Sequence, residues 1–169
     1  MSRLYSVSPD DRLQLRLHGK GFFFDNARRK HGTLMHEVLS RIRTPKDIPA
    51  SVESYRLAGV INREEAAELI SRLEELLQAE EVKAWYDGSA RVLNEVDILF
   101  GKGLSKRPDR AIIKGGKVIV VDYKFGERQD KRHPNQVRNY LQLIRKMGFE
   151  RVDGYLWYVE LGKIEAVNK

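Results

Sequence analysis

RPDRAIIKGGKVIVVDYK, residues 107–124, is the stretch that decides the fold of this chain. Two runs rich in β-branched residues flank Gly115-Gly116, and a glycine pair tolerates the positive φ angles that a two-residue hairpin turn requires. We therefore predict a β-hairpin in which Lys114 faces Lys117. Carried outward, this register places Asp109 directly opposite Asp122.

The predicted register brings two carboxylates and a lysine to one end of the hairpin. Opposed side chains lie about 5 Å apart, and like charges so placed repel, so Asp109 and Asp122 favour a cation beside them. Lys124 shares a strand face with Asp122, because side chains alternate between faces. The spacing thus predicts a metal-binding geometry. The alternative is an edge hairpin whose charges are solvated.

Composition sets the outer limits of the interpretation. The 169 residues amount to one domain, and a hydrophobic content of 41% is sufficient for a core. Without cysteine the chain can form neither a thiolate zinc site nor an iron–sulfur cluster, so a metal must bind to oxygen and imidazole ligands. The net charge of +7 suits a polyanion. We find no signal-peptide pattern and no apolar run of about 18 residues, and expect a cytoplasmic protein without a membrane partner.

Helical periodicity dominates the first half of the chain. Apolar residues recur at i+4 within 32–43, and Thr44-Pro45 should end that helix. A second helix is predicted from residue 48 to Leu57. Asn62 and Glu65 have capping-box spacing, and predict a long amphipathic helix from Arg63 to about Ala79.

The second half reads as a sheet with one crossover helix. Arg91–Phe100 is predicted as a strand, on which Glu95 either helps to build the acidic site or is a solvated carboxylate. A helix from Pro134 to Met147 and a strand at 152–159 then form a parallel, right-handed crossover after the hairpin. A last strand is expected at 164–167. The fold class is α/β, a mixed sheet flanked by helices.

Three further side chains carry possible chemistry. His36 lies roughly 130° from the centre of its helix's apolar stripe, so it is a poor candidate for a core histidine. Taken by itself, a surface histidine without a role is the commoner explanation for such a residue. Gln136 and Tyr140, four residues apart, share one helix face. Tyr140 could be a core residue with Gln136 in solvent, or both could face the acidic site.

These motifs resemble those of a known family. Pro108-Asp109 followed by Asp122-x-Lys124 resembles the signature of the PD-(D/E)XK nucleases. The pattern Gly32-x-x-x-His36-x-x-Leu39 and the later Gln136-x-x-x-Tyr140 resemble the RecB-like members, in particular the C-terminal nuclease modules of RecB- and AddA-type helicase-nucleases. The resemblance implies a restriction-endonuclease-like core. We expect a single nuclease domain over 1–169, with an arm and strand at 1–31, a helical part at 32–86 and a sheet core at 89–169.

The resemblance also implies an activity and a ligand set. It implies metal-dependent hydrolysis of DNA phosphodiester bonds, as the exonuclease of a DNA repair and recombination complex. Mg²⁺, or Mn²⁺, would be bound by His36, Asp109, Asp122 and the backbone carbonyl of Tyr123. Lys124 would orient water or stabilise charge on the phosphate. Gln136 and Tyr140 would position Lys124 or the scissile strand.

Partners follow from the same resemblance. Basic residues near the motifs are expected to contact DNA phosphates: Arg107, Arg110, Arg128, Lys131 and Arg132. The chain lacks the four cysteines of iron–sulfur-bearing relatives and lacks a Gly-x4-Gly-Lys-Ser/Thr phosphate loop. We therefore expect a superfamily-1 helicase motor in the same or a partner chain, and favour a module of a longer protein over a stand-alone nuclease. The alternatives are a catalytically silent DNA-binding scaffold and a structure-specific or RNA-directed endonuclease.

Overall fold

A computed structural model describes most of the chain. By their internal contacts the residues divide into two units, Met1–Leu34 and Met35–Lys169, and the site residues discussed below belong to the second. The single domain expected over the whole chain stays a prediction. The described residues are 20–94, 98–99, 105–106, 108–126 and 130–167. Glu95, Arg107, Arg128 and the strand expected in the arm at 1–31, around residues 12–17, lie outside them.

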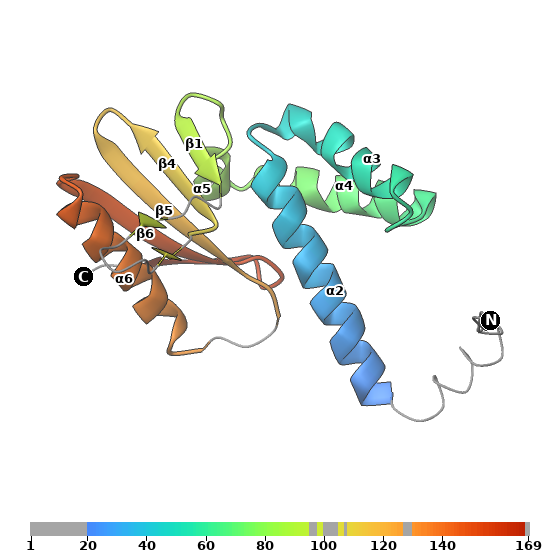
Figure 1. The fold of residues 1–169 in the computed structure, drawn as a ribbon. Coiled ribbons are helices and arrows are strands. Elements are labelled where there is room, and N and C mark those ends of the chain that lie inside the picture. The colour runs from blue at the N-terminus through green and yellow to red at the C-terminus, as the bar shows by residue number, and fades with distance from the viewer. Residues whose placement is uncertain (1–19, 95–97, 100–104, 107, 127–129, 168–169) are drawn as a thin grey trace, which may run out of the picture. The chain divides into compact units, whose positions relative to one another are not determined.

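A five-stranded mixed sheet is the main element of the second unit (Figure 1). Its order is β1-β4-β5-β6-β7. The β5–β6 pair is parallel and the other three pairs are antiparallel. The strands are β1 (Arg91–Asn94), β4 (Arg110–Lys114), β5 (Lys117–Lys124), β6 (Arg151–Tyr158) and β7 (Lys163–Val167). The mixed α/β class is confirmed.

The predicted hairpin is present as β4 and β5. Gly115 and Gly116 have φ angles of +55° and +75°, the positive values that the two-residue turn requires. Lys114 pairs with Lys117, and the ladder in this register ends at Arg110 opposite Val121. Strand β5 then continues past the end of β4, so its last residues are free of that neighbour.

Two parts of the predicted strand 91–100 are described as strands, β1 and Ile98–Leu99, while residues 95–97 and 100 lie outside the described residues. The described part of the β1–β4 ladder ends with Asn94 opposite Arg110. Ile98–Leu99 forms β2, which pairs with Ser105–Lys106, β3, in a separate two-stranded sheet.

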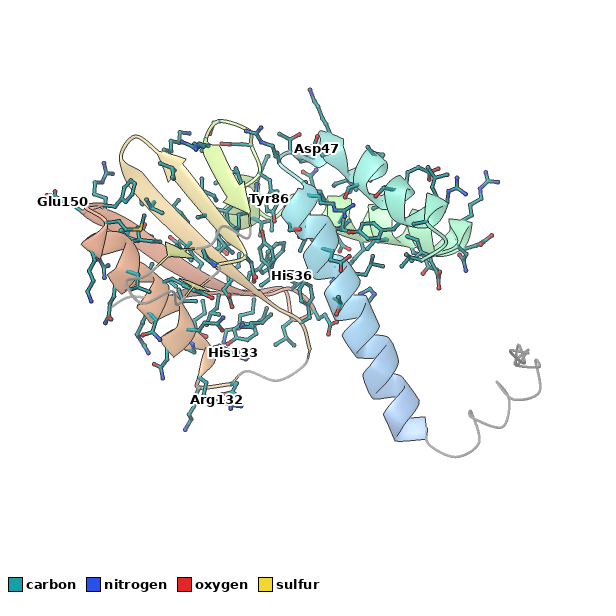
Figure 2. All side chains as sticks on the ribbon, viewed as in Figure 1. His36, Asp47, Tyr86, Arg132, His133 and Glu150 are labelled. Carbon is teal, nitrogen blue, oxygen red and sulfur yellow. The ribbon has the colours of Figure 1, made fainter. Side chains whose placement is uncertain are left out.

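The helices before the sheet agree in part with expectation. Helix α2 spans Lys20–Arg41, so it begins well before the predicted start at residue 32. The predicted start, Gly32, lies inside α2. A glycine inside a helix destabilises it by only about 1 kcal/mol, which is too little to end the helix. Part of the predicted arm at 1–31 is therefore helical. A short 3-10 helix, η1 (Pro45–Asp47), follows α2, and Asp47 Oδ2 accepts the N–H of Thr44 at 2.8 Å (Figure 2).

Two paired helices follow η1. Helix α3 (Ile48–Leu57) ends as predicted, and α4 (Arg63–Leu77) carries the predicted capping box: Asn62 accepts from the N–H of Glu65 and Glu65 from that of Asn62, both at 2.8 Å. A single turn, α5 (Glu80–Lys83), was not predicted.

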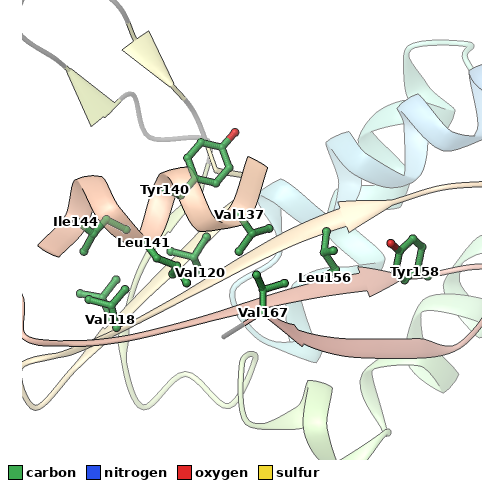
Figure 3. Packing of buried hydrophobic residues seen from close by; sticks show 10 residues of the cluster. Val118, Val120, Val137, Tyr140, Leu141, Ile144, Leu156, Tyr158 and Val167 are labelled. Atoms are coloured by element: carbon green, nitrogen blue, oxygen red, sulfur yellow. The ribbon is translucent and has the colours of Figure 1, made fainter. Parts of the chain in front are cut away.

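Helix α6 (His133–Lys146) covers one face of the sheet and confirms the predicted crossover between β5 and β6 (Figure 3). Val137, Leu141 and Ile144 pack on Val118, Val120 and Leu156. A Cβ on Gly154 of β6 would lie 2.6 Å from Val137 Cγ1, so only glycine allows the helix this approach. In the part of the chain that the structure describes, no helix has the length and apolar character needed to cross a membrane.

Candidate active site

The motif residues lie close together where β5 extends beyond the end of β4. Asp122, Tyr123 and Lys124 are the last residues of β5, and Asp109 directly precedes β4. Strand alternation directs Asp122 and Lys124 to the face covered by α6, and Tyr123 to the other face. On that other face His36 of α2 lies edge-on to the Tyr123 ring, with 6.0 Å between ring centroids. Figure 2 shows His36 pointing from α2 toward the strands.

Asp109 is bonded from two directions. Its Oδ2 accepts the backbone N–H of Tyr123 at 2.6 Å, and its Oδ1 lies 2.6 Å from Nε2 of His36. An ionised carboxylate can only accept, so in this arrangement Nε2 of His36 donates. Asp109 therefore joins the end of β5 to α2. The ladder keeps the predicted register as far as Arg110 opposite Val121, one residue before the predicted Asp109–Asp122 pair, and the bond of Asp109 to Tyr123 was not predicted.

The backbone carbonyl of Tyr123 points to the side of β5 on which Asp109 lies. The N–H and C=O of one strand residue point to the same side, and the N–H of Tyr123 points at Asp109. The next residue confirms the alternation, since the carbonyl of Lys124 accepts from Val159 on the β6 side at 3.0 Å. The predicted backbone ligand is thus directed toward Asp109.

Asp122 is a buried acid with incomplete compensation. Only 2% of its surface is exposed. Lys124 Nζ lies 2.6 Å from its Oδ2 in an ion pair, and among the described residues Oδ2 has no other polar partner. Burial first, and then the charge of Asp109, raises the pKa of Asp122 to about 6, against the opposing effects of Lys124 and His36. An additional cation beside Asp122 would be stabilised.

Lys124, Gln136 and Tyr140 form one hydrogen-bonded chain. Lys124 Nζ donates to Oε1 of Gln136 at 3.1 Å, and Gln136 Nε2 donates to the hydroxyl of Tyr140 at 3.0 Å. Tyr140 is also buried in the core under α6, so both interpretations of this pair hold in part. Burial raises the pKa of the Tyr140 hydroxyl, which keeps it protonated. These two hydrogen bonds hold the Lys124 ammonium beside Asp122.

The donor set fits a hard divalent cation, but it is not preassembled. Among the described residues no three His, Cys, Asp or Glu side chains form a metal cluster. His36 and Asp109 are hydrogen-bonded to each other instead. Carboxylate and carbonyl oxygens with one imidazole suit Mg²⁺ or Mn²⁺. The poorly satisfied Oδ2 of Asp122 is the atom that most favours such an ion.

One predicted DNA contact is wrong. Arg110 has no exposed surface, and its guanidinium lies 3.8 Å from the centre of the Tyr86 ring. Such a group cannot reach a DNA phosphate. Lys131 is exposed, and Arg132 is 88% exposed and bonded to Asp130 at 2.6 Å, so both stay candidates.

Sequence reasoning missed the framework behind the site. Tyr86 is 1% exposed, and its hydroxyl lies 2.8 Å from that of Tyr123. Trp85 packs against Trp157 of β6, with ring centroids 6.2 Å apart. The available signal was the pair of adjacent aromatic residues, Trp85 and Tyr86, since large aromatic side chains are usually buried.

His133 was also overlooked. It starts α6, near the site, and its Nδ1 lies 3.4 Å from the hydroxyl of Tyr158. Burial, and then the charge of Lys124, lowers the pKa of His133. The charge of Lys124 thus acts on this imidazole, and His133 belongs to the surroundings of the site.

Comparison with curated proteins found no match. The family model described as PD-(D/E)XK nuclease superfamily matches residues 12–169, which is most of the chain. The matched range includes Asp109, before β4, and Asp122 and Lys124, at the end of β5. The chain belongs to the PD-(D/E)XK nuclease superfamily.

Proposed function

We propose that this protein is a divalent-metal-dependent deoxyribonuclease, the RecB-like exonuclease module of a DNA repair and recombination helicase-nuclease. The observation that carries the proposal is the buried carboxylate of Asp122, which has Lys124 at 2.6 Å and the like charge of Asp109 nearby, and whose pKa is raised to about 6. A buried carboxylate that is only partly neutralised is costly to a folded protein. Such a cost is expected where function requires it.

The proposed ion would be held by Asp109, Asp122, His36 and the Tyr123 carbonyl. When bound, Mg²⁺ or Mn²⁺ supplies charge that offsets the negative phosphate and makes water a better nucleophile at neutral pH. His36 must give up the proton on Nε2 before that nitrogen can act as a ligand. Asp109 accepts from Tyr123 and so keeps its carboxylate at the end of β5.

Lys124 has a separate role. Asp122 and Gln136 hold its ammonium on the α6 face, and its side chain is 20% exposed, so it can reach a bound phosphate. There it would donate hydrogen bonds as charge develops on the phosphate oxygens, which lowers the barrier by preorganised electrostatics. Tyr140 fixes Gln136, and Gln136 fixes Lys124.

Two features favour the RecB-like subgroup. His36, from the first helix motif, is bonded to Asp109, and the Gln136–Tyr140 pair is bonded to Lys124. Both subgroup motifs thus join the nuclease motif at one place. We extend the proposal to a superfamily-1 helicase motor, in the same or a partner chain, that delivers DNA to Lys131 and Arg132.

The test is digestion of end-labelled linear and covalently closed DNA, single- and double-stranded, with Mg²⁺, Mn²⁺ or chelator. We expect metal-dependent cleavage of linear DNA, with circles surviving, and a loss of at least about a hundredfold in Lys124→Ala. Lys117→Ala is the matched control, because Lys117 lies on the same strand but is paired with Asp153 at 2.5 Å, at the hairpin end. The control should cleave at the wild-type rate.

Three other outcomes would redirect the proposal. Cleavage of closed circles or of RNA would favour an endonuclease or an RNA-directed enzyme. DNA binding without cleavage by wild type and variant alike, even with a helicase motor present, would favour the silent scaffold. Cleavage that Lys124→Ala retains would place the chemistry elsewhere.

A further inference from the structure

Arg110 is the most completely enclosed charged side chain near the site. It is 0% exposed. Its Nε and Nη2 donate to the carbonyl of Trp85 at 3.2 and 2.9 Å, and its Nη1 donates to that of Ile42 at 2.8 Å. Nη2 also reaches the carbonyl of Arg43 at 3.4 Å. One guanidinium therefore bridges two segments that are distant in sequence.

The carbonyls of Ile42 and Arg43 belong to the two residues that follow α2, which ends at Arg41. The C-terminal end of a helix favours a cation, because its last carbonyls lack intrahelical partners. The Arg110 guanidinium bonds directly beyond this end and places its positive charge there. His36 lies six residues before Ile42, roughly 9 Å along the helix axis. Anchoring this end of α2 therefore limits where His36 can be.

The same residue also fixes the partner of His36. Asp109 is the residue immediately before Arg110 in the chain, and its carboxylate lies 2.6 Å from Nε2 of His36. Because Arg110 starts β4, opposite Val121, it sets the position of Asp109 at the end of the ladder. The positions of His36 and Asp109 therefore both depend on the buried guanidinium of Arg110.

Aromatic side chains also connect Arg110 to His36 and Asp109. The guanidinium of Arg110 lies over the Tyr86 ring, and the Tyr86 hydroxyl bonds to that of Tyr123 at 2.8 Å. Tyr123 in turn lies edge-on to His36 and donates its N–H to Asp109. A lysine ammonium could lie over the Tyr86 ring, but it lacks the planar fork that bonds the carbonyls of Trp85 and Ile42 together.

We propose that Arg110 is a positioning residue, which sets His36 and Asp109 in the arrangement required for binding the divalent ion. This inference rests on the proposed function and deepens it. The arginine touches neither substrate nor ion; it acts through α2, Tyr86 and the backbone of β4. Loss of groups that orient metal ligands typically weakens metal affinity 10- to 100-fold.

The experiment compares Arg110→Lys, which keeps the charge and removes the fork, with wild type. Mn²⁺ affinity is measured by calorimetry on protein shown to be folded by circular dichroism. We expect affinity to fall about tenfold or more. In a His36→Ala background, Arg110→Lys should cause a smaller loss of affinity, because only its effect through Asp109 remains. Arg145→Lys is the control, since Arg145 also donates to a backbone carbonyl, that of Val152 at 3.4 Å, away from the site, and it should bind Mn²⁺ as wild type does.

A second readout needs no metal. The imidazole ¹⁵N resonances of His36, assigned with His36→Ala, report its hydrogen bond to Asp109 in chelator. Arg110→Lys should move them toward the values of a free imidazole, and Arg145→Lys should leave them unchanged. If Arg110→Lys does not fold, Tyr86→Leu removes the stacking surface and should weaken Mn²⁺ binding and alter the His36 resonances in the same direction.

The outcomes separate the two proposals. A folded variant with wild-type Mn²⁺ affinity and wild-type His36 resonances overturns the positioning role. A loss of affinity in the His36→Ala background that is as large as in the wild-type background also overturns it, because Arg110 would then affect metal binding without acting through His36. The proposed function fails if wild-type protein does not bind Mn²⁺, or if Asp122→Asn binds Mn²⁺ as tightly as wild type does. In either case the His36 resonances still decide the role of Arg110.

Discussion

Replacing Asp122 by asparagine should make the metal-free protein more stable at neutral pH. Asparagine has nearly the same shape but carries no charge, so it resembles the protonated acid. The pKa of Asp122 is raised from 3.8 to about 6, chiefly by burial. Each pKa unit corresponds to about 1.4 kcal/mol, so the ionised form costs the folded state roughly 3 kcal/mol.

The sign follows from proton linkage. The folded protein binds this proton more tightly than the unfolded chain does, so its contribution to stability is full below pH 3.8 and is lost as pH rises through 6. Wild type in chelator should therefore lose stability between pH 4 and pH 7. Asp122→Asn should lack this loss, exceed wild type by up to about 3 kcal/mol at pH 7.5, and approach it near pH 4.

Urea unfolding followed by tryptophan fluorescence measures the difference directly. Trp85 and Trp157 are buried, 5% and 1% exposed, and should report loss of the fold. The control is Asp153→Asn, whose carboxylate is 40% exposed and which should change stability by less than about 1 kcal/mol. Saturating Mg²⁺ should stabilise wild type and have little effect on Asp122→Asn. An Asp122→Asn protein that is no more stable than wild type at pH 7.5, or a difference independent of pH, would refute the reasoning.

Three further predictions concern the surroundings of the site. Gly154→Ala should destabilise the fold by about 1–3 kcal/mol in urea, because its Cβ would meet Val137; unchanged stability would mean that α6 shifts freely. Gln136→Ala should slow cleavage roughly tenfold with little change in KM, because it frees the Lys124 ammonium; a raised KM alone would instead assign Gln136 to DNA binding. Mn²⁺ affinity measured by calorimetry should fall as pH drops below about 6, since Asp122 must lose its proton to bind; a flat profile from pH 5 to 8 would exclude it as a ligand.

Local spacing by itself was sufficient for the elements that depend on near neighbours. Gly115-Gly116 determined the turn, and the turn determined which residues face one another. Asn62 and Glu65 marked the start of α4 because a capping box lies within one helical turn. Strand alternation placed Lys124 beside Asp122 for the same reason: the backbone period is the same wherever the strand lies.

The sequence also named most of the candidate site without showing how its parts touch. His36 was assigned through its helix motif, but its bond to Asp109 joins α2 to the hairpin, and no local rule measures that distance. The Gln136–Tyr140 pair was expected to share a face, and the structure adds that Lys124 reaches it.

Only the tertiary structure decided the fate of charges that sequence reasoning left at the surface. Arg110 stands among basic residues in a basic chain, and its sequence context predicted a DNA contact. Its burial depends on the end of α2, on the Trp85 carbonyl and on the Tyr86 ring, which together satisfy its donors. Whether a charge is solvated or enclosed is determined by the groups that distant segments bring to it, because burying an ion is tolerable only when all of those partners are in place.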